Sequence, residues 1–401
     1  MSDITASEPP ALRIDPPRFL RGAVLTRLFA LLPEARVVGG AVRDALAGRR
    51  SADIDLASPL PPQEVTHRLR EADIRVVPTG LAHGTVTAVL RGHPIEITTL
   101  RRDVATDGRH AEVTFTDDWR QDAARRDFTI NALSMAPDGA VYDYFGGVAD
   151  LKAGIVRFVG DPAQRIAEDY LRVLRYMRFY ARYASAPPDA AVRAALRDAV
   201  PRLDRLSAER VWSELRQILG TPDPTRAIAL MAELGILAAV IQEGTDPSHL
   251  ARLVAARAPA DPLQRLAALL TGDVEAIADR LKLSGEERRR LLALRATPLA
   301  SPGDDDAALR RLLADHDRAA LIDRTWLDGE ATKAWTTLRT RLAGLPQPVF
   351  PLEGRDVVAL GVSPGQRVGA LLRTTRAWWL AGGCVATAEA CRREVLRHLV
   401  G

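Results

Sequence analysis

Asp53 and Asp55 are separated by one residue, a spacing that can do chemistry if both lie on one β-strand. Positions i and i+2 of a strand point to the same side, so the two carboxylates would stand side by side. Two such groups repel each other unless a cation or a proton lies between them. Mg²⁺ is typically held by one or two carboxylates together with substrate phosphates. The pair is therefore a candidate magnesium site, although two surface aspartates on an edge strand have the same spacing.

A glycine turn precedes this pair. Residues 37–44 predict a strand, a turn at Gly39 and Gly40, and the start of a helix. Glycines at this place let backbone N–H groups approach an anionic ligand at the helix N-terminus. A Gly-Gly turn is usually only a turn, but together with Asp53 and Asp55 it favours a site for nucleoside phosphates and metal ions.

Two further segments carry polar groups that suit such a site. Glu96 lies in an otherwise apolar and β-branched run, where an inward carboxylate is costly unless it is paired or metal-bound; it could equally face water. Arg125 and Arg126 can clamp phosphates, and Asp127 and Asn131 can hold ribose hydroxyls. On its own the second segment could be a solvated charge cluster.

In this order the motifs resemble the nucleotidyltransferase superfamily that contains the tRNA CCA-adding enzymes and the bacterial poly(A) polymerases, in its bacterial and eukaryotic branch (class II). The resemblance covers about residues 36–220, somewhat under half of the chain. The residues that carry it are Gly39, Gly40, Arg43, Asp44, Asp53, Asp55, Arg125, Arg126, Asp127, Asn131, Ala132 and the run Glu168, Asp169, Tyr170, Leu171, Arg172, Val173, Leu174 and Arg175.

The resemblance implies a polymerase-β-like head in which Asp53 and Asp55 bind two Mg²⁺ ions and Glu96 is the third catalytic carboxylate. A 3′-hydroxyl of RNA would attack the α-phosphate of CTP or ATP and release pyrophosphate, with the ions about 3.5–4 Å apart. The nucleotide would be bound by Gly39, Gly40, Arg43, Asp44, Arg125, Arg126, Asp127, Asn131, Asp169, Arg172 and Arg175.

Base selection is expected from Asp169 and Arg172, which are three residues apart and share a face of the helix predicted over residues 163–183. A carboxylate accepts hydrogen bonds and a guanidinium donates them. Asp169 would accept from the amino group of cytosine or adenine, and Arg172 would donate to the neighbouring ring nitrogen. Guanine and uracil present the reverse pattern, which leaves charged groups mispaired. An ordinary surface ion pair has the same spacing.

Two segments favour CCA addition over polyadenylation. Residues 79–86 are similar to the CCA-adding type and lack the Arg-Arg-Phe stretch of the poly(A) polymerases. The loop over residues 102–111, with Asp103, Asp107 and Arg109, resembles the flexible element linked in this family to adding the terminal A. An A-adding enzyme and a poly(A) polymerase are the alternatives within the class. An inactive RNA-binding module is the alternative from another class.

The elements that must position these residues differ between the two parts of the chain. Short runs rich in Val, Ile and Thr predict strands, whereas helical periodicity predominates after Pro162. The predicted fold class is therefore an α+β head with a mixed sheet, followed by an all-α region. Strands are predicted over residues 36–38, 53–57, 74–77, 85–90, 94–100, 132–135, 141–144 and 155–159. The predicted domains are a flexible tail 1–20, a head 21–150, a neck 151–220, a body 221–300 and a helical tail 301–401.

Charge and composition indicate the partner. Only three of the 55 basic residues are lysines, which either reflects genome bias or serves a polyanion. Between Arg157 and Arg216, 12 arginines face 8 acidic residues, an excess equal to the net charge of +4 of the whole chain. The neck helices are therefore expected to bind the acceptor stem of tRNA through phosphate contacts, and the helical remainder to reach the elbow by shape.

Other classes of protein do not fit the sequence. No apolar run approaches the roughly 20 residues that span a bilayer, and the first twenty residues lack the apolar segment of a secretory signal. Two cysteines cannot form a disulfide framework. We expect a cytoplasmic location, and the sequence implies no membrane contact and no protein partner.

Overall fold

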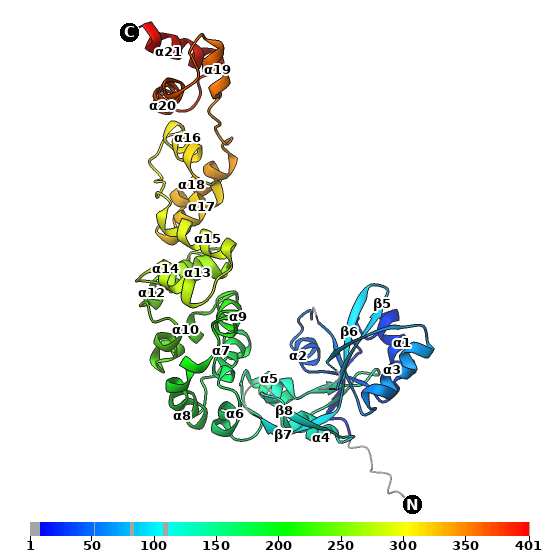
Figure 1. Ribbon diagram of the computed structural model, residues 1–401. Coiled ribbons are helices and arrows are strands. Elements are labelled where there is room, and N and C mark those ends of the chain that lie inside the picture. Colours follow the sequence, from blue (N-terminus) through cyan, green and yellow to red (C-terminus); the bar gives the residue numbers. More distant parts are fainter. Residues whose placement is uncertain (1–8, 52, 81–83, 107–110, 401) are drawn as a thin grey trace, which may run out of the picture. The chain divides into compact units, whose positions relative to one another are not determined.

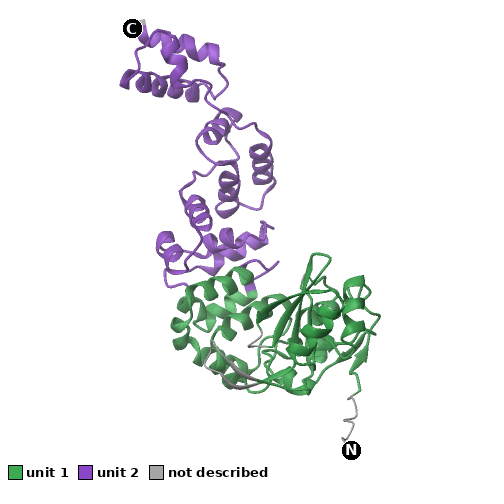
Figure 2. Cartoon of the chain, turned by 45° about the vertical axis from the view of Figure 1, so that its right-hand side comes forward, with its two compact units in different colours: residues 1–218, 226–240 green, residues 219–225, 241–401 purple. Residues whose placement is uncertain are grey.

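A computed structural model describes residues 9–51, 53–80, 84–106 and 111–400. The chain divides into two compact units, residues 1–218 with 226–240 and residues 219–225 with 241–401 (Figure 2). The strands lie in the first unit, and helices make up the rest (Figure 1). The predicted fold class is thereby confirmed. The finer division into head, neck, body and tail stays a prediction.

A mixed eight-stranded sheet, in the order β1-β10-β9-β2-β3-β6-β5-β4, forms the frame of the first unit. Its only parallel pair among the described strands is β3 with β6. The strands are β1 (Leu12–Arg13), β2 (Arg36–Val38), β3 (Asp55–Ser58), β4 (Arg75–Gly80), β5 (Thr85–Leu90), β6 (His93–Thr99), β9 (Ser134–Met135) and β10 (Ala140–Tyr142). A separate antiparallel pair consists of β7 (Arg101–Thr106) and β8 (Ala111–Phe115).

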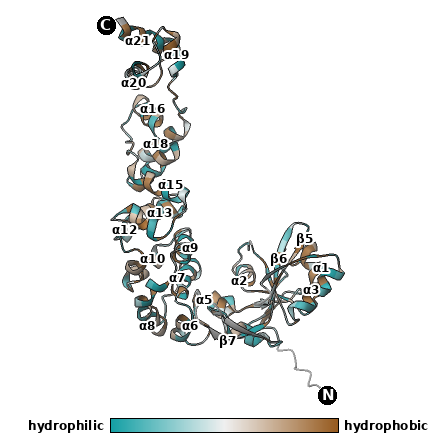
Figure 3. Cartoon of the chain, in the orientation of Figure 1, coloured by the Kyte–Doolittle hydropathy of each residue, from teal (hydrophilic) through white to brown (hydrophobic). Residues whose placement is uncertain are grey.

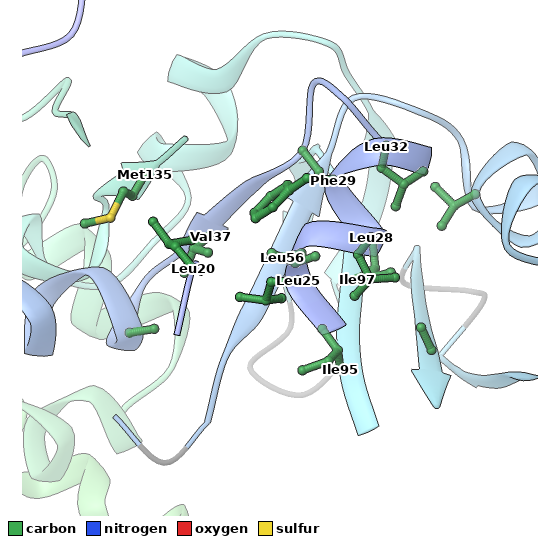
Figure 4. Close-up of a cluster of buried hydrophobic side chains, with 14 of the residues drawn as sticks. Leu20, Leu25, Leu28, Phe29, Leu32, Val37, Leu56, Ile95, Ile97 and Met135 are labelled. Atoms are coloured by element: carbon green, nitrogen blue, oxygen red, sulfur yellow. The ribbon is translucent and has the colours of Figure 1, made fainter. Parts of the chain in front are cut away.

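One face of the sheet packs against α1 (Ala23–Leu31) and α3 (Pro62–Glu71) (Figure 4). Leu28 and Leu69 of these helices and Leu56 and Ile97 of the central strands are fully buried there. In β3 and β6 the polar Asp55 and Glu96 directly precede these core residues, so alternation places them on the opposite face. Burial of the core residues on one face of the sheet thus fixes the strand register, and this register places the acidic side chains on the opposite face.

The remaining helices of the first unit lie partly between the strands and partly after them in the chain. Several begin at an aspartate whose side chain accepts a bond from the second or third helical N–H, as at Asp118, Asp161 and Asp189. The helices are α2 (Gly40–Leu46), α4 (Trp119–Ala124), η2 (Thr129–Asn131), α5 (Gly147–Ala153), α6 (Pro162–Glu168), α7 (Leu171–Tyr183), α8 (Ala190–Asp198), η3 (Val200–Arg205), α9 (Ala208–Leu219), α10 (Thr225–Glu233) and α11 (Ile236–Val240).

The second unit is helical, and Figure 3 shows hydrophobic and hydrophilic residues alternating along its helices. Its apolar faces form separate clusters, one around Leu309 and Leu342 and another around Trp379 and Val395. Its helices are α12 (Pro247–Ala255), α13 (Pro262–Leu269), α14 (Val274–Arg280), α15 (Gly285–Ala296), α16 (Asp306–Asp315), α17 (Arg318–Leu327), α18 (Lys333–Gly344), α19 (Gly354–Ala359), α20 (Gln366–Ala381) and α21 (Ala388–Val400). No described helix is both long and apolar enough to cross a membrane.

Three local predictions were wrong. The single helix expected over residues 163–183 is interrupted between α6 and α7. The strand expected over residues 155–159 is reduced to an isolated bridge between Phe158 and Phe128. The segment expected to be a loop, residues 102–111, has strand structure at both ends in β7 and β8, while Asp107 and Arg109 lie outside the described residues.

Candidate active site

The predicted motifs meet at one edge of the sheet. Strand β2 runs antiparallel to β3 with Val38 opposite Asp55, and β6 runs parallel to β3 with Glu96 opposite Asp55. The end of β2 therefore lies where β3 begins and beside the middle of β6. This topology brings the glycine turn that follows β2 next to Asp55 at the start of β3 and near Glu96 in β6. Asp53 precedes β3 rather than lying within it, although both aspartates line the same cleft.

The glycine turn needs a glycine at its first position, Gly39. Gly39 has a φ of +66°, a region that other residues rarely adopt. A Cβ built there would lie 2.9 Å from a guanidinium nitrogen of Arg126. Gly40 begins α2, and its Cβ position is 3.5 Å from the Arg43 guanidinium. A side chain at Gly39 would therefore strain the backbone and displace the Arg126 guanidinium, whereas one at Gly40 would make only an ordinary contact with Arg43.

A cleft of about 750 Å³ extends from this edge of the sheet to the neck helices α7 and α9. Most of the residues expected to bind nucleotide line it, whereas Arg125 and Glu96 are not among its lining residues. The predicted residues that line the cleft are Gly39, Gly40, Arg43, Asp44, Asp53, Asp55, Arg126, Asp127, Asn131, Asp169, Arg172 and Arg175.

Asp127 joins the sheet part of the site to helix α7. It is 9% exposed and accepts hydrogen bonds from the Arg175 guanidinium at 2.6 and 2.9 Å and from the Asn131 amide at 2.9 Å. Burial opposes ionisation of Asp127, but Arg175, Asn131 and the Phe128 N–H outweigh it and lower the pKa of this carboxyl. Asp127 and Asn131, expected to hold ribose hydroxyls, are thus already bonded to protein groups.

Arg43 lies within the same network. Its guanidinium is 8% exposed and bonds Asp44 at 3.0 and 3.1 Å and the Asn131 side-chain oxygen. Asp44 also accepts from the Tyr183 hydroxyl at 2.5 Å. These bonds fix α2 against α7, so the position of the glycine turn is tied to that of the neck helix.

The adjacent arginines are held by one acid that sequence analysis missed. Asp122 on α4 pairs with Arg125 at 2.8 Å and with Arg126 at 3.3 Å. Burial opposes ionisation of Asp122, but the two arginines and the Arg101 N–H outweigh it and lower its pKa. Of the two arginines, Arg126 is the one that reaches the cleft lining. The i, i+3 and i, i+4 spacing from Asp122 on α4 to the two arginines just after it is the signal that could have revealed the clamp.

Asp169 and Arg172 do not share a helix face, contrary to the prediction. Asp169 adopts an extended conformation after α6, and its carboxylate accepts from the Leu171 N–H at 3.0 Å and from Arg210 at 2.6 Å. Arg172, on the first turn of α7, donates to Glu168 and to the Arg165 carbonyl at 2.7 Å. Both side chains nevertheless line the cleft, because the helix break turns Asp169 towards it.

Comparisons with known proteins agree with this arrangement. Residues 35–157 match the family described as "Poly A polymerase head domain", and residues 188–246 match "Probable RNA and SrmB- binding site of polymerase A". CCA tRNA nucleotidyltransferase 1, mitochondrial, of Danio rerio is 37% identical over 363 residues, which cover 86% of this chain and 83% of that protein. The Mus musculus protein of the same name is 36% identical over 390 residues, covering 90% and 86%. The crystal structure of the CCA-adding enzyme of Bacillus stearothermophilus in complex with CTP is similar with a TM-score of 0.77 and 26% identity, over 94% of this chain and 98% of that one.

The chain belongs to the CCA tRNA nucleotidyltransferase family. Membership confirms the resemblance inferred from the motifs, and with it the class of enzyme. The matched head domain, residues 35–157, contains the glycine turn, the carboxylates and the arginine pair. The helix break at Asp169 and the neck arginines lie beyond it, in the part that the full-length relatives also cover.

The residues at the sheet edge fit a divalent cation of the kind this family is expected to use. Burial and the adjacent Glu96 raise the pKa of the Asp55 carboxyl, and Asp53 adds to the shift while Arg126 opposes it. Across the described residues, neither aspartate nor Glu96 forms an ion pair, and no three His, Cys, Asp or Glu side chains gather closely enough to hold a metal alone. An acidic pair short of positive charge suits Mg²⁺, which completes its shell with water and substrate phosphates.

Sequence analysis also missed several groups that line the cleft or, like Glu214, hold its arginines from outside the lining. Glu214 on α9 is buried and pairs with Arg178 at 2.7 Å and with Arg175 at 3.6 Å. Arg210, one turn before Glu214, bonds Asp169. The spacing of Arg210 and Glu214 indicates that they share one face of α9. Their partners, on α7 and just before it, are distant in sequence, so the spacing alone does not reveal the pairs. The other missed residues of the cleft lining are Arg50, Ser51, Leu171, Phe179, Arg182 and Gln217.

Proposed function

We propose that this chain adds C, C and A in turn to the 3′ end of tRNA, with CTP and ATP as substrates and without a nucleic-acid template. One observation carries the proposal: an aspartate pair that has no basic partner among the described residues opens onto a cleft lined by eight arginines. The named relatives and the related structure with CTP support it. The reaction joins O3′ of the RNA to the α-phosphorus as the bond to pyrophosphate breaks, and the hydroxyl proton is released.

Each side of the site has a distinct task in this reaction. Asp53 and Asp55 would hold Mg²⁺, with Glu96 as the third carboxylate beside Asp55. When bound, the ions would lower the pKa of the attacking hydroxyl and neutralise the leaving pyrophosphate. Arg126 and the backbone of the glycine turn would bind the triphosphate on the cleft side. Arg43, buried and bonded to Asp44, would act there mainly by fixing the turn.

Asp169 and Arg172 would select the base. The carboxylate accepts from the amino group and the guanidinium donates to the ring nitrogen, a pattern that cytosine and adenine satisfy and that guanine and uracil do not. Arg175 would contribute through Asp127 and Glu214, by holding α7 in place. The predicted loop residues Asp103, Asp107 and Arg109 would assist addition of the terminal A.

The neck helices would hold the acceptor stem of tRNA, and the second unit would bind towards the elbow. Relatives from fish and mouse are named as mitochondrial, whereas those from bacteria are named simply as CCA-adding enzymes. The cytoplasmic location therefore stays a prediction.

One assay separates the proposal from its alternatives. The protein is incubated with Mg²⁺, labelled CTP or ATP, and tRNA transcripts that end at the discriminator base, at C or at CC. We expect products that stop after CCA from all three transcripts. ATP incorporation only into the CC-ending transcript would indicate an A-adding enzyme, and A tails of unlimited length a poly(A) polymerase. No product from any transcript would indicate an inactive RNA-binding module.

A further inference from the structure

A second cavity, of about 780 Å³, adjoins the aspartate pair. Its walls are the segment that enters α1, the start of β3, and the ends of β5 and β6 at their connecting turn. Glu96, absent from the lining of the nucleotide cleft, lines this cavity. Among the described residues, Asp53 and Asp55 are the ones that the cavity and the cleft share. The acidic pair therefore stands between two separate spaces.

The two spaces differ in charge in a way that matches the two reactants. Eight arginines line the nucleotide cleft, which suits the several charges of a triphosphate. The cavity has one arginine, Arg91, and one histidine, His93. A single guanidinium suits the single charge of a phosphodiester in an RNA strand. Phe19 adds an aromatic wall, the kind of surface on which an RNA base can stack.

In-line transfer also requires two spaces. The attacking oxygen and the leaving pyrophosphate lie on opposite sides of the α-phosphorus, with carboxylate-bound ions between them. If the triphosphate lies in the cleft, the RNA 3′ end must reach Asp53 and Asp55 from the other space. We propose that the cavity holds the 3′-terminal nucleotide of the RNA acceptor strand, and that Arg91 positions it by binding its backbone phosphate. This inference rests on the proposed function.

Arg91 is well placed for that task. With Gly92 it forms the two-residue turn between β5 and β6, and both residues have positive φ values, +50° and +80°. Such a turn is short and rigid, because its twist matches that of the flanking strands. The Arg91 side chain is exposed, and it has no hydrogen bond or ion pair with the rest of the described chain. A fixed backbone thus presents an uncommitted guanidinium at the cavity.

The turn geometry provides a variant that preserves the fold. Asn favours the left-handed conformation of Arg91, and Asn-Gly is a preferred pair for this type of turn. Arg91→Asn therefore removes the charge without straining the hairpin. Arg70→Gln is the matched control, because Arg70 is an exposed arginine of the same unit and lies on α3. Its side chain has no partner in the described chain, and it does not line the cavity.

Steady-state kinetics with full-length protein, CTP and a tRNA transcript ending at the discriminator base test the proposal. We expect Arg91→Asn to raise KM for the tRNA about 10-fold, the loss expected for one charge-assisted hydrogen bond, with KM for CTP unchanged. The slope of log kcat/KM for tRNA against log salt should become shallower by about 0.7, as for one lost phosphate contact on a single strand. Arg91→Lys should recover most of the affinity.

Three outcomes would overturn the inference while the proposed function stands. In the first, Arg91→Asn changes KM for tRNA no more than Arg70→Gln does. In the second, it raises KM for CTP instead, which would place part of the nucleotide in the cavity. In the third, KM for tRNA rises but the salt slope stays that of the unsubstituted protein, which would indicate a structural role. An unsubstituted protein without CCA addition would refute the proposed function itself.

Cross-linking locates the RNA end independently of kinetics. A tRNA transcript that carries 4-thiouridine at its 3′ terminus is irradiated with the protein, and the modified peptides are identified by mass spectrometry. We expect cross-links within residues 19–25 or 91–95, the two segments that contribute most of the cavity lining. Cross-links confined to residues 169–182 of the cleft would refute the placement.

Discussion

Asp55 and Glu96 at the sheet edge and Asp122 and Asp127 beside the neck are acidic groups of the same unit, held in opposite ways. Asp122 and Asp127 are buried, and arginines outweigh the cost of that burial, so their pKa values are lowered. Asp55 is more exposed and lies next to another carboxylate, and partial desolvation together with Glu96 raises its pKa. The unit thus has acids that fix arginines and acids that remain available for a cation, and the neighbouring side chains decide which role an acid has.

The largest effect should come from removing an acid that remains available for a cation. Asp53→Ala should lower incorporation of CMP by at least about 10³-fold, because the loss of several kcal/mol of metal-mediated stabilisation acts directly on the transition state. Binding of tRNA and the melting temperature should hardly change, since Asp53 forms no ion pair within the described chain.

Radiolabelled CTP incorporation and a gel-shift assay with tRNA measure the two effects. Glu34→Ala, which removes another exposed acid of the same unit, serves as the control. An active Asp53→Ala protein would refute the metal assignment. It would also contradict the division between acids that bind a cation and acids that fix arginines.

Removal of an acid that fixes arginines should instead lower the local stability of the fold. Asp127→Asn leaves Arg175 without its main partner, which we expect to cost about 2–3 kcal/mol, less than for a fully buried pair because Arg175 is partly exposed. Hydrogen exchange of the α7 amides, residues 171–183, measures the loss of local stability. Asp138→Asn, which breaks the exposed pair with Arg13, should change stability by less than about 0.5 kcal/mol.

The same variant has a defined dependence on pH. The pKa of Asp127 in the folded state is lowered, so its contribution is complete above the ordinary value of about 3.9 and disappears as the pH falls through the folded value. The difference between the unsubstituted protein and Asp127→Asn should therefore be full at pH 6 and shrink below about pH 4. A difference that grows in acid would contradict the assigned direction.

The predicted strands matched the observed ones where the alternation of residues and their burial agree. The β-branched runs predicted over residues 36–38 and 85–90 are β2 and β5 with the same bounds, because alternation and burial agree there. The β7–β8 pair was missed because its sequence mixes charged and small residues without an apolar stripe. The interruption at Asp169 was missed because apolar periodicity continues through it, and the competing bond to Arg210 comes from a residue 41 positions away.

Within the candidate site, residue types and order were predictable, but partners were not. The glycine turn and the aspartate pair have local signatures, and topology places them together as expected. Arg125 is an exception: it pairs with Asp122 and is not among the residues that line the cleft. Asp122 and Glu214 carry no motif of their own, so only their folded neighbours show that they hold the arginines.

Asp169 combines features of both groups of acids. It is paired with Arg210, and it also lines the cleft where the nucleotide is proposed to bind. Asp169→Ala and Arg172→Ala should each reduce the preference for CTP over UTP by about 10-fold to 100-fold, the range expected for a lost polar discrimination of 1–3 kcal/mol. Competition between labelled CTP and UTP measures the preference. Unchanged selectivity would remove these residues from base selection.

The bond between Asp169 and Arg210 has a consequence for how a nucleotide enters. If Asp169 binds the base as proposed, an arriving base must take the place of Arg210, which already donates to this carboxylate. Such an exchange would return little net affinity, but it would set a threshold. Uracil and guanine carry a carbonyl oxygen where cytosine and adenine carry the N4 or N6 amino group, so they could not replace the bond that is broken. The site would thus resist occupation by the wrong nucleotide through competition from its own arginine, without any need for a tighter fit.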